Sequence, residues 1–522
     1  MPFALALREQ NYRILASGGT AKALKAAGVP AQDVASLVGG RDILGHKVVT
    51  LSRELHAGLL ADYVTEVQEM ADLNLAYVDL VCVDLYPLEA EIAREGATRD
   101  SVIKLTDVGG PTMLHSGSKG RRIVICDPAD RMLVIEWLKA GKPDEDQFLT
   151  DLVAKAENVV GRYITTSSIY HGAGRYAAVF GERVVKCCYG ENKDQESALF
   201  STGNGDPLAL DQFVKAESGM MNPSHINYCD MDSALTTLCH ATDAFRRESY
   251  FPCIAIAVKH GNACGAGYGD TPIAALKKMI EGDRTAILGA SVMTNFPIGE
   301  EEAEILLHWK NLPGEKRRLI DCLDVPSITT GAIKLMERRS GKCRVMVNPA
   351  LASRVAVTME TGDQIRKVRG GFLKQSAMKL TENPLSDPAY LICGKRPARR
   401  VLLDGLFAWA VTSTSVSNTV VLVKDGRLIG NGCGRQSRVD ACRLAVQLAQ
   451  QNGHNITGAV AWSDSFFPKL DGPKMLVEAG VRTIFTTSGS TSDDEIFDYF
   501  RQQPWLTVIA IPDKINRAFC RH

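Results

Sequence analysis

The stretch RILASGGTAKALKAA, residues 13–27, carries the clearest local signal for the fold. Its first four residues predict a short buried strand, and Ala21 to Ala27 predict a helix after the Ser-Gly-Gly-Thr turn. A strand that passes through a tight turn into a helix is typical of α/β proteins. Further strands are predicted at His46–Leu51, Val78–Asp84 and Arg122–Cys126. Together these elements predict an open, mostly parallel sheet that ends near residue 155.

The remainder of the chain predicts one large unit made of two similar halves. In the first half, Ile254–Lys259 has the pattern of a buried strand and leads into HGNACG, residues 260–265. In the second half, Thr419–Lys424 and Arg427–Gly430 flank Asp425-Gly426, a dipeptide that favours a two-residue hairpin turn. We therefore expect one domain over residues 1–155 and a second over residues 160–522.

Composition excludes several classes of protein. The 522 residues contain 60 Lys+Arg and 60 Asp+Glu, and a net charge of zero argues against binding nucleic acid by bulk charge. No apolar run approaches the ~18 residues of a membrane span, and the first residues lack the cationic region of a secretory signal. The 14 cysteines include no C-x-x-C pair. We expect reduced thiols in a cytoplasmic protein without a structural metal.

The tetrapeptide Ser17, Gly18, Gly19 and Thr20 lies between a predicted strand and a predicted helix. Glycines let the backbone approach an anion, and the start of a helix offers free N–H groups and the positive end of its dipole. The segment can therefore bind a phosphate. It can equally be a plain tight turn with a helix cap, and the residues alone leave both interpretations open.

Lys259 and His260 stand at the end of a predicted apolar strand, before a glycine-rich loop. A cation beside an imidazole can serve acid–base chemistry near neutral pH, although a solvated lysine and a packed histidine would give the same pattern. Zinc deaminases need H-x-E and P-C-x-x-C. Here Asn262 replaces the glutamate and the second motif is absent, so metal-dependent deamination is not expected.

Three other segments combine charge with aromatic or capping residues. QSRVD, residues 436–440, opens a predicted helix, and its Arg438 can pair with a carboxylate or a phosphate. SDSFFP, residues 463–468, places two aromatics after a strand-like run, where such side chains often wall the pocket of a flat ligand. An arginine–aromatic pair, Arg517 and Phe519, stands near the end. Ordinary capping, core packing and a frayed tail are the alternatives.

Taken together, these segments closely resemble one family, in order and over nearly the whole chain. It is the bifunctional purine-biosynthesis family of aminoimidazole carboxamide ribonucleotide (AICAR) transformylase and inosine monophosphate (IMP) cyclohydrolase. The matching stretches are ASGGTAKAL (16–24), VDLYPLEAEIA (83–93), DVGGPTML (107–114), DPAD (127–130), YGEN (189–192), VKHGNACG (258–265), SNTVVLVKDG (417–426), GRQSRVDACRLA (434–445) and SDSFFP (463–468).

The resemblance implies an N-terminal methylglyoxal-synthase-like cyclohydrolase domain with a doubly wound parallel sheet. Two cytidine-deaminase-like subdomains without zinc would follow and form the transformylase. It implies that AICAR and the co-substrate formyl-tetrahydrofolate are the substrates and that IMP is the final product. It also implies a cytoplasmic homodimer with transformylase sites at the subunit interface, and no nucleic-acid or membrane partner.

The resemblance assigns roles to residues of the transformylase half. His260 matches the family's base and Lys259 its cationic partner, whereas Asn418 and Asp471 match residues that orient the carboxamide and face the folate. The positions that match nucleotide-binding residues are Tyr189, Asn227, Gly289, Arg438, Phe466, Arg517 and Phe519. One departure is Cys188, where the family has an arginine that holds the AICAR phosphate. Lys186 is a candidate replacement.

In the cyclohydrolase half, Tyr86, Asp107 and Lys119 match family site positions, and residues 17–20 match the phosphate loop. The family's Lys-Thr-Leu-His-Pro falls on residues 49–53, so that Val49 replaces a lysine and Ser52 a histidine. Measured against the family, the chain also starts inside the first helix, without the first strand and its phosphate-binding turn. Either the true start lies upstream, or this domain is degenerate. The resemblance therefore supports the prediction of cyclisation less strongly than the prediction of formyl transfer.

Two alternatives to a bifunctional enzyme remain. The chain could be a transformylase alone with a degenerate N-terminal domain, which would accumulate formyl-AICAR. It could also be a non-catalytic protein that binds a nucleotide or folate with the same fold. The departures at Cys188 and at Lys193-Asp194 motivate the second alternative.

Overall fold

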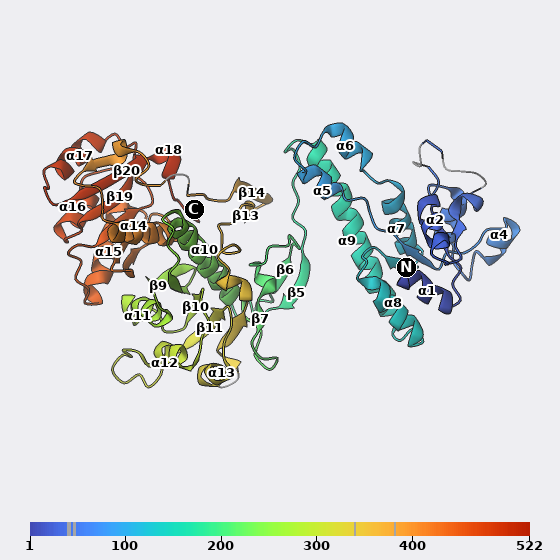
Figure 1. The fold of residues 1–522 in the computed structure, drawn as a ribbon, viewed down its shortest axis with the longest axis horizontal. Coiled ribbons are helices and arrows are strands. Elements are labelled where there is room, and N and C mark those ends of the chain that lie inside the picture. Colours follow the sequence, from blue (N-terminus) through green and yellow to red (C-terminus); the bar gives the residue numbers. More distant parts are fainter. Residues whose placement is uncertain (39–42, 45–47, 339–340, 381–382, 522) are drawn as a thin grey trace. The chain divides into compact units, whose positions relative to one another are not determined.

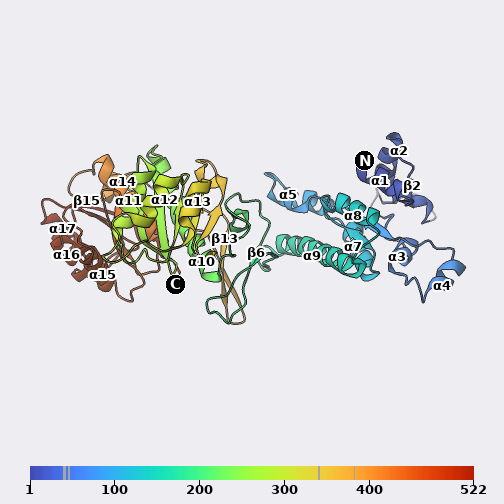
Figure 2. The same cartoon turned by 90° about the horizontal axis from the view of Figure 1, so that it is seen from below.

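The computed structural model describes residues 1–38, 43–44, 48–338, 341–380 and 383–521. Its internal contacts divide the chain into two compact units, Met1–Phe180 and Gly181–His522. Figures 1 and 2 draw the elements of both units. Each unit is described by itself below.

Short parallel strand pairs and surrounding helices form the N-terminal unit. β1 (Leu15–Ala16) pairs with β2 (Gln32–Asp33), and β3 (Leu80–Cys82) pairs with β4 (Ile123–Ile125). The helices are α1 (Pro2–Glu9), α2 (Gly18–Ala26), α3 (Arg53–Leu60), α4 (Val67–Asp72), α5 (Leu88–Ala93), α6 (Arg99–Lys104), α7 (Gly109–Lys119), α8 (Asp130–Lys139) and α9 (Glu145–His171). The predicted strand–turn–helix at residues 13–27 is thus present as β1 and α2.

The predicted strand at His46–Leu51 is wrong where the structure describes it. Val48 makes only an isolated bridge to Ile43, and residues 49–51 are bends; residues 46 and 47 lie outside the described part. Val49 packs against the apolar cluster around Leu59 and Leu114. Packing of single side chains has therefore overridden the β propensity of this Val-Val-Thr run.

The long helix α9 passes through residues 155–160, where the sequence suggested a domain boundary. Its Ala156 and Val160 are buried in the same apolar cluster as Val81 of β3 and Val124 of β4. The helix is therefore part of the N-terminal core, and the contacts of the chain divide after Phe180.

A twelve-stranded mixed sheet organises the C-terminal unit. Its order is β15-β20-β19-β18-β16-β17-β9-β8-β10-β11-β12-β7. The strands are β7 (Val214–Lys215), β8 (Cys253–Lys259), β9 (Asn262–Gly269), β10 (Ala290–Thr294), β11 (Ile320–Val325), β12 (Arg344–Val347), β15 (Leu391–Cys393), β16 (Val420–Lys424), β17 (Arg427–Gly432), β18 (Val460–Ser463), β19 (Thr483–Ser488) and β20 (Thr507–Pro512). Two separate hairpins are β5 (Glu182–Lys186) with β6 (Ala198–Ser201), and β13 (Asp363–Val368) with β14 (Gly371–Ser376).

The sheet is built from one motif used twice. In the first half, β8 pairs antiparallel with β9 and β10, then β10, β11 and β12 run parallel, and β7 closes the edge antiparallel. In the second half, β16, β17, β18, β19, β20 and β15 repeat those relations in the same order. The halves meet where β9 lies beside β17, with Arg427 opposite Gly267. The two similar halves predicted from the sequence are therefore present.

Helices cover both faces of this sheet (Figure 1). On one face α10 (His225–Arg247) and α14 (Arg399–Thr412) pack against each other over a core that includes Phe245, Phe407 and Trp409. Two other cores, one in each half, underlie the remaining helices. These helices are α11 (Pro272–Gly282), α12 (Glu300–His308), α13 (Thr330–Met336), α15 (Arg438–Gln451), α16 (Asp471–Glu478) and α17 (Asp493–Arg501); α18 (Asp513–Asn516) follows β20.

Glycines let one helix of each half lie directly on a strand. A Cβ atom at Gly267 would meet the backbone of Ala275 in α11, and one at Gly432 would overlap the carbonyl oxygen of Ala441 in α15. The glycines of β17 therefore serve helix packing.

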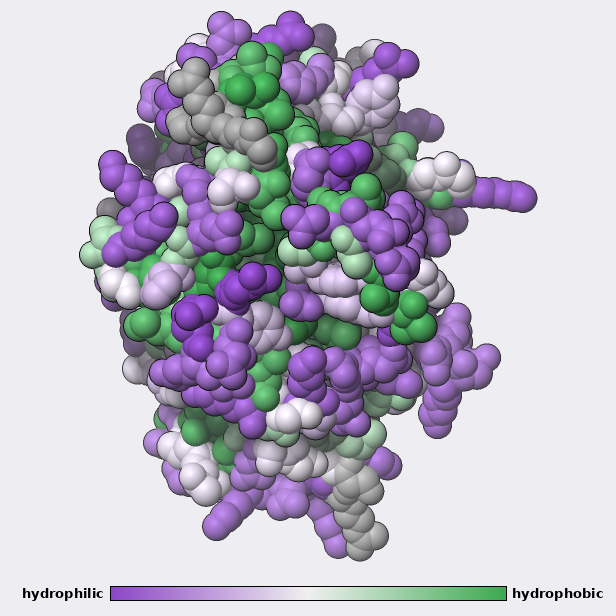
Figure 3. Space-filling model, turned by 90° about the vertical axis from the view of Figure 1, so that its right-hand side faces the viewer, coloured by the Kyte–Doolittle hydropathy of each residue, from purple (hydrophilic) through white to green (hydrophobic). Residues whose placement is uncertain are grey.

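The surface mixes apolar and polar residues. On the face drawn in Figure 3, apolar residues come to the surface between hydrophilic ones. The most exposed large apolar side chains are Val64, at 85%, and Val355, at 86%. Scattered exposure of this kind is ordinary for globular proteins. Within the described part of the chain, no helix has the length and apolar character needed to cross a membrane.

We expect Gly432→Ala to destabilise the C-terminal unit by about 1–3 kcal/mol, because α15 must move away from β17 to admit a methyl group. The measurement is the midpoint of thermal unfolding. Gly219→Ala is the control, because a Cβ atom there has open space around it. Equal midpoints for the two variants would contradict the packing argument.

Candidate active site

The turn between β8 and β9 presents Lys259 and His260. Lys259 pairs with Asn262, and the two residues between them, His260 and Gly261, have φ of +53° and +74°. Positive φ at both central residues is the geometry of a two-residue type I′ hairpin. The His260 side chain is exposed, whereas Lys259 is half-buried and donates a hydrogen bond to the Leu288 carbonyl at 2.9 Å. The turn therefore places an accessible imidazole beside a fixed ammonium group.

This turn is held from two sides. Oδ1 of Asp230, on α10, accepts a hydrogen bond from the Gly261 N–H at 2.7 Å. Arg521 donates to the Gly261 carbonyl at 2.6 Å and also binds the Ser233 hydroxyl. Burial raises the pKa of the Asp230 carboxyl, and the Gly261 N–H opposes that shift. The backbone around His260 is therefore fixed, whereas its side chain is exposed.

Asn262 joins the two halves of the unit at this point. Its Nδ2 donates to the His260 carbonyl at 3.1 Å, and its Oδ1 accepts from the Val416 N–H at 3.0 Å. Val416 leads into Asn418, whose amide donates to the carbonyls of Arg435 and Gln436 at 2.9 and 3.2 Å. The predicted residues Lys259, His260 and Asn418 thus belong to one connected set of contacts.

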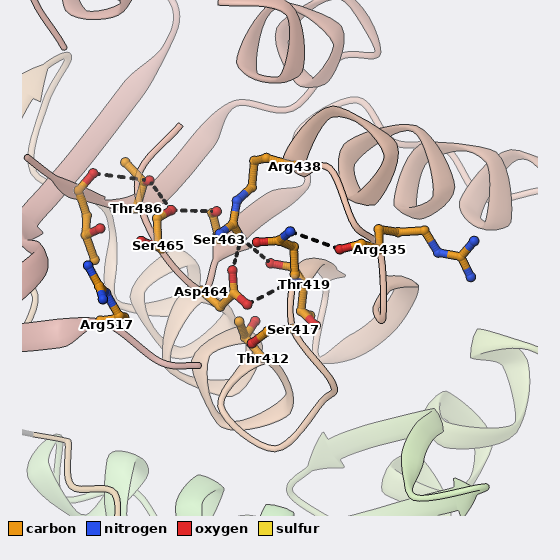
Figure 4. A network of polar contacts seen from close by, with 12 residues as sticks. Thr412, Ser417, Thr419, Arg435, Arg438, Ser463, Asp464, Ser465, Thr486 and Arg517 are labelled. Atoms are coloured by element: carbon orange, nitrogen blue, oxygen red, sulfur yellow. Dashed lines mark hydrogen bonds and ion pairs between the residues drawn. The ribbon is translucent and has the colours of Figure 1, made fainter. Parts of the chain in front are cut away.

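Arg438 opens α15 and pairs with Asp464 (Figure 4). Asp464 follows β18 and is fully buried, and Arg438 is 7% exposed. Burial lowers the pKa of Arg438 to about 10. Oδ2 of Asp464 also accepts the Thr419 N–H at 3.0 Å, next to Asn418. The charge of Arg438 is therefore used inside the protein to tie α15 to the start of β16.

The C-terminal segment is an ordered part of this region. Arg517 donates from Nε to Asp513 at 2.6 Å, and its guanidinium lies 5.0 Å from the ring centre of Phe519. Burial of Asp513 is outweighed by its hydrogen bonds from Arg517, Ser465 and Thr487, so its pKa lies below the usual value. Cys520 and Ser417 exchange hydrogen bonds of 3.1 and 3.2 Å. The segment returns to the Asn418 region and is not a frayed tail.

The other predicted residues of this unit lie at helix ends and strand ends. Tyr189 accepts the His225 N–H through its carbonyl at 3.0 Å, and Asn227 forms the capping box of α10 with Ser224. Gly289, with φ of +78°, adjoins the Leu288 carbonyl that Lys259 binds. Asp471 begins α16 and is exposed, and Phe466 is half-buried.

In the N-terminal unit, residues 17–20 are exposed at the start of α2, and no side chain caps that helix. Free backbone donors are therefore available there, as a phosphate site requires. A carboxylate oxygen of Asp33 lies 3.5 Å from where a Cβ of Gly18 would be. This negative charge opposes a phosphate beside Gly18.

Of the remaining predicted residues of that unit, Asp107 and Lys119 lie at opposite ends of α7, and Tyr86 lies between β3 and α5. Asp107 precedes the helix and accepts the Gly110 N–H at 3.1 Å, while its own N–H donates to the Tyr163 hydroxyl at 2.8 Å. Tyr86 is 52% exposed. Lys119 is the last residue of α7, about 15 Å along the helix axis from Gly109 at ~1.5 Å rise per residue. The structure therefore separates Lys119 from the Asp107 end of the helix.

The replacements at residues 49 and 52 have structural roles. Val49 packs against the N-terminal core. Ser52 is the N-cap of α3, and its hydroxyl accepts the Leu55 N–H at 3.2 Å. Neither side chain supplies the cation or imidazole that the resemblance places there.

Three residues at the site were not assigned there from the sequence: Asp230, Asn262 and Arg521. Asp230 follows Asn227 by one helical turn, so the i,i+3 spacing offered a signal. Asn262 stands two residues after His260 and was weighed only as a replacement for a deaminase glutamate. Arg521 acts across 260 positions of sequence, and nothing local indicates such a contact.

Comparison with known proteins agrees with this architecture. The family model described as AICARFT/IMPCHase bienzyme matches residues 120–448, and the model described as MGS-like domain matches residues 1–112. The chain belongs to the AICARFT/IMPCHase bienzyme family. The resemblance inferred from the sequence and the α/β fold that it implied are thereby confirmed. A solved structure titled "Crystal structure of ForH" is 28% identical over 33% of this chain and 92% of its own, with a TM-score of 0.29.

We expect Asp464→Ala to destabilise the protein by about 3–5 kcal/mol, because it leaves the Arg438 charge buried without its partner. Thermal unfolding measures the effect. Asp498→Ala provides the matched control, since it removes an aspartate whose pair with Arg501 is solvent-exposed. A similar loss in both variants would show that the burial of the Arg438–Asp464 pair is not what stabilises the fold.

Proposed function

We propose that the chain transfers a formyl group from formyl-tetrahydrofolate to AICAR and, more slowly, closes the ring to give IMP. We assign formyl transfer to the unit that begins at Gly181 and ring closure to the unit that ends at Phe180. The observation that carries the proposal is Asn262, which joins the Lys259–His260 turn to the segment of Asn418. Family membership supplies the reaction class, and this junction supplies a candidate centre for it.

The chemistry of formyl transfer requires a base. The AICAR amine is a poor nucleophile, because its lone pair is delocalised into the ring and the carboxamide. A bond forms between the amine nitrogen and the formyl carbon, and the bond from that carbon to the folate nitrogen breaks. The amine loses a proton, and the departing folate nitrogen takes one up, which releases tetrahydrofolate. His260 is our assigned base, since an accessible imidazole can take that proton near neutral pH. To Lys259, whose ammonium group donates to the Leu288 carbonyl, we assign stabilisation of the developing oxyanion.

We assign the remaining residues of this unit to substrate binding. Asn418 orients the carboxamide, and Asp471 faces the folate. The nucleotide would be held by Tyr189, Asn227, Gly289, Arg438, Phe466, Arg517 and Phe519. The contacts of Arg438 with Asp464 and of Arg517 with Asp513 fix both guanidinium groups. A guanidinium has five N–H donors, so each arginine keeps donors for a ligand.

Ring closure joins the carboxamide nitrogen to the formyl carbon and expels water. We assign it to Tyr86, Asp107 and Lys119, with residues 17–20 at the phosphate. Three observations favour a slower step here: the apolar packing of Val49, the Asp33 carboxylate beside Gly18 and the distance of Lys119 along α7. The same observations favour the second candidate, a transformylase without cyclohydrolase activity.

Family membership also suggests the oligomeric state, the cellular location and the co-substrate of the enzyme. We propose a homodimer in the cytoplasm, with formyl-tetrahydrofolate as co-substrate and no metal in the reaction. Sedimentation or light scattering of the purified chain tests the oligomeric state.

We expect His260→Ala to lower formyl transfer by roughly 10²- to 10⁴-fold, the usual contribution of a positioned general base. In the assay, the chain is supplied with AICAR and formyl-tetrahydrofolate, and the products formyl-AICAR and IMP are separated and quantified over time. His308→Ala is the control, because His308 is a surface histidine of α12 that forms an exposed pair with Glu304 and has no assigned role. Binding of AICAR without turnover by the wild-type chain would instead identify a non-catalytic binding protein.

In the same assay, we expect formyl-AICAR to accumulate before IMP, because ring closure lacks the lysine that Val49 replaces. Val49→Lys should raise the rate of IMP formation from added formyl-AICAR, since a half-buried position lets a lysine extend its ammonium toward solvent. IMP appearing without any lag in the wild-type chain would refute the slower second step.

A further inference from the structure

Arg344 is a buried cation without an acidic partner among the described residues. It begins β12 and is 6% exposed. Its Nη1 donates to the Lys342 carbonyl at 3.1 Å, its Nη2 lies 3.7 Å from Sγ of Cys188, and its Nε has no partner in the described structure. A thiol is a weak acceptor. Burying a guanidinium charge that has only weak hydrogen-bond partners costs free energy, unless an anion binds to it.

Strand register aligns Arg344 of β12 with the end of β8, next to the turn that carries His260. Val258 of β8 is opposite Ser291 of β10, Ser291 is opposite Cys322 of β11, and Cys322 is opposite Arg344. Three strand spacings of ~4.8 Å put Arg344 about 14 Å across the sheet from the residue that precedes Lys259. This distance suits a ligand that extends from the His260 turn toward β12.

The side chains of this line share the face that α10 covers. Met293 and Met346, each two residues further along its strand, are buried in the core beneath α10. Because side chains two apart on a strand point the same way, Ser291 and Arg344 face α10 as well. The Ser291 hydroxyl is buried and, like Arg344 Nε, has no hydrogen-bond partner in the described structure. Oδ2 of Asp324, which is opposite Met293 and Met346 and therefore on the same face, is also buried without a partner in the described structure. These three unpartnered polar groups on one buried face indicate a polar ligand.

The first turn of α10 adds to the positive potential at Cys188. The Cys188 N–H donates to the Pro223 carbonyl at 3.3 Å, and the His225 N–H donates to the Tyr189 carbonyl at 3.0 Å. Residues 188 and 189 therefore lie against the N-terminus of a 23-residue helix. The positive end of its dipole favours an anion there. Lys186, the replacement suggested by the sequence, is 71% exposed and faces Glu196 instead.

We propose that Arg344 binds the phosphate of the nucleotide substrate, in the role that an arginine at position 188 would fill. The proposal rests on the proposed function. A guanidinium can give two parallel N–H donors to a phosphate, and such a contact replaces the weak one with the Cys188 thiol. Cys188, which is smaller than arginine, leaves the space through which Arg344 reaches from β12.

The test compares AICAR with its riboside, which lacks the phosphate, as ligands of Arg344→Gln in the full-length chain. We expect the Kd of AICAR to rise by roughly ten- to hundredfold, as for loss of a charge-assisted contact, and the Kd of the riboside to stay unchanged. Lys342→Gln, which removes an exposed charge two residues away, is the control. Equal weakening of both ligands, or of neither, would overturn the assignment.

A second variant leaves Arg344 in place. Cys188→Asp gives its guanidinium an internal carboxylate, which should weaken AICAR by a similar factor and spare the riboside. This variant decides the question if Arg344→Gln does not fold. In the double variant Cys188→Arg/Arg344→Gln, a restored AICAR affinity supports the exchange of roles. A wild-type chain that binds neither AICAR nor its riboside would refute the proposed function itself.

Discussion

The arrangement of the C-terminal unit depends on a carboxylate of a buried helix that binds the backbone of a hairpin turn. In the first half, Asp230 of α10 accepts the Gly261 N–H in the turn between β8 and β9. In the second half, Asp404 of α14 accepts the N–H groups of Asp425 and Gly426 between β16 and β17, at 2.9 and 2.8 Å. The central residues of both turns have positive φ. This contact fixes the central helix of each half against the hairpin that it covers.

The two copies of this contact serve different ends. At Gly261 the turn carries His260 and adjoins Lys259, Asn262 and the segment of Asn418, so the fixed backbone presents groups capable of chemistry. At Gly426 the carboxylate of Asp404 also accepts the Tyr268 hydroxyl at 2.6 Å, and the central residues of the turn are Asp425 and Gly426. Lys424, which pairs with Arg427 as Lys259 pairs with Asn262, donates to the carbonyls of Asn455 and Thr457. The duplicated fold thus has the same supporting interaction and a strand-end lysine in both halves, whereas a histidine stands in the first turn only.

The sequence predicted the duplicated α/β architecture, because strand runs and the Asp-Gly turn are local signals. It predicted Lys259 and His260 at the end of a strand, and that is where they lie. It failed at Val49 and Thr50, where contacts with distant residues override β propensity. It assigned Arg438 to a ligand without finding Asp464, and it could not find Arg521 or Arg344, since each acts through residues far away in sequence. Local sequence patterns predict helices, strands and turns. Pairs between residues far apart in sequence determine which charged side chains can contact a ligand.

The seam between the two halves has a mechanical consequence. β9 and β17 share a single registered pair, Arg427 with Gly267, whereas β8 with β9 and β16 with β17 share long ladders and the edge pairs β12–β7 and β15–β20 share two pairs each. The main-chain bonding of the sheet is thus thinnest at the boundary that separates His260 from Asn418, and packing of α10 on α14 carries much of the connection. A small shear along this boundary would alter the spacing of the two residues while each half stayed rigid. The ease with which the β9–β17 boundary deforms, more than the rigidity of either half, would then determine how closely His260 and Asn418 approach a ligand.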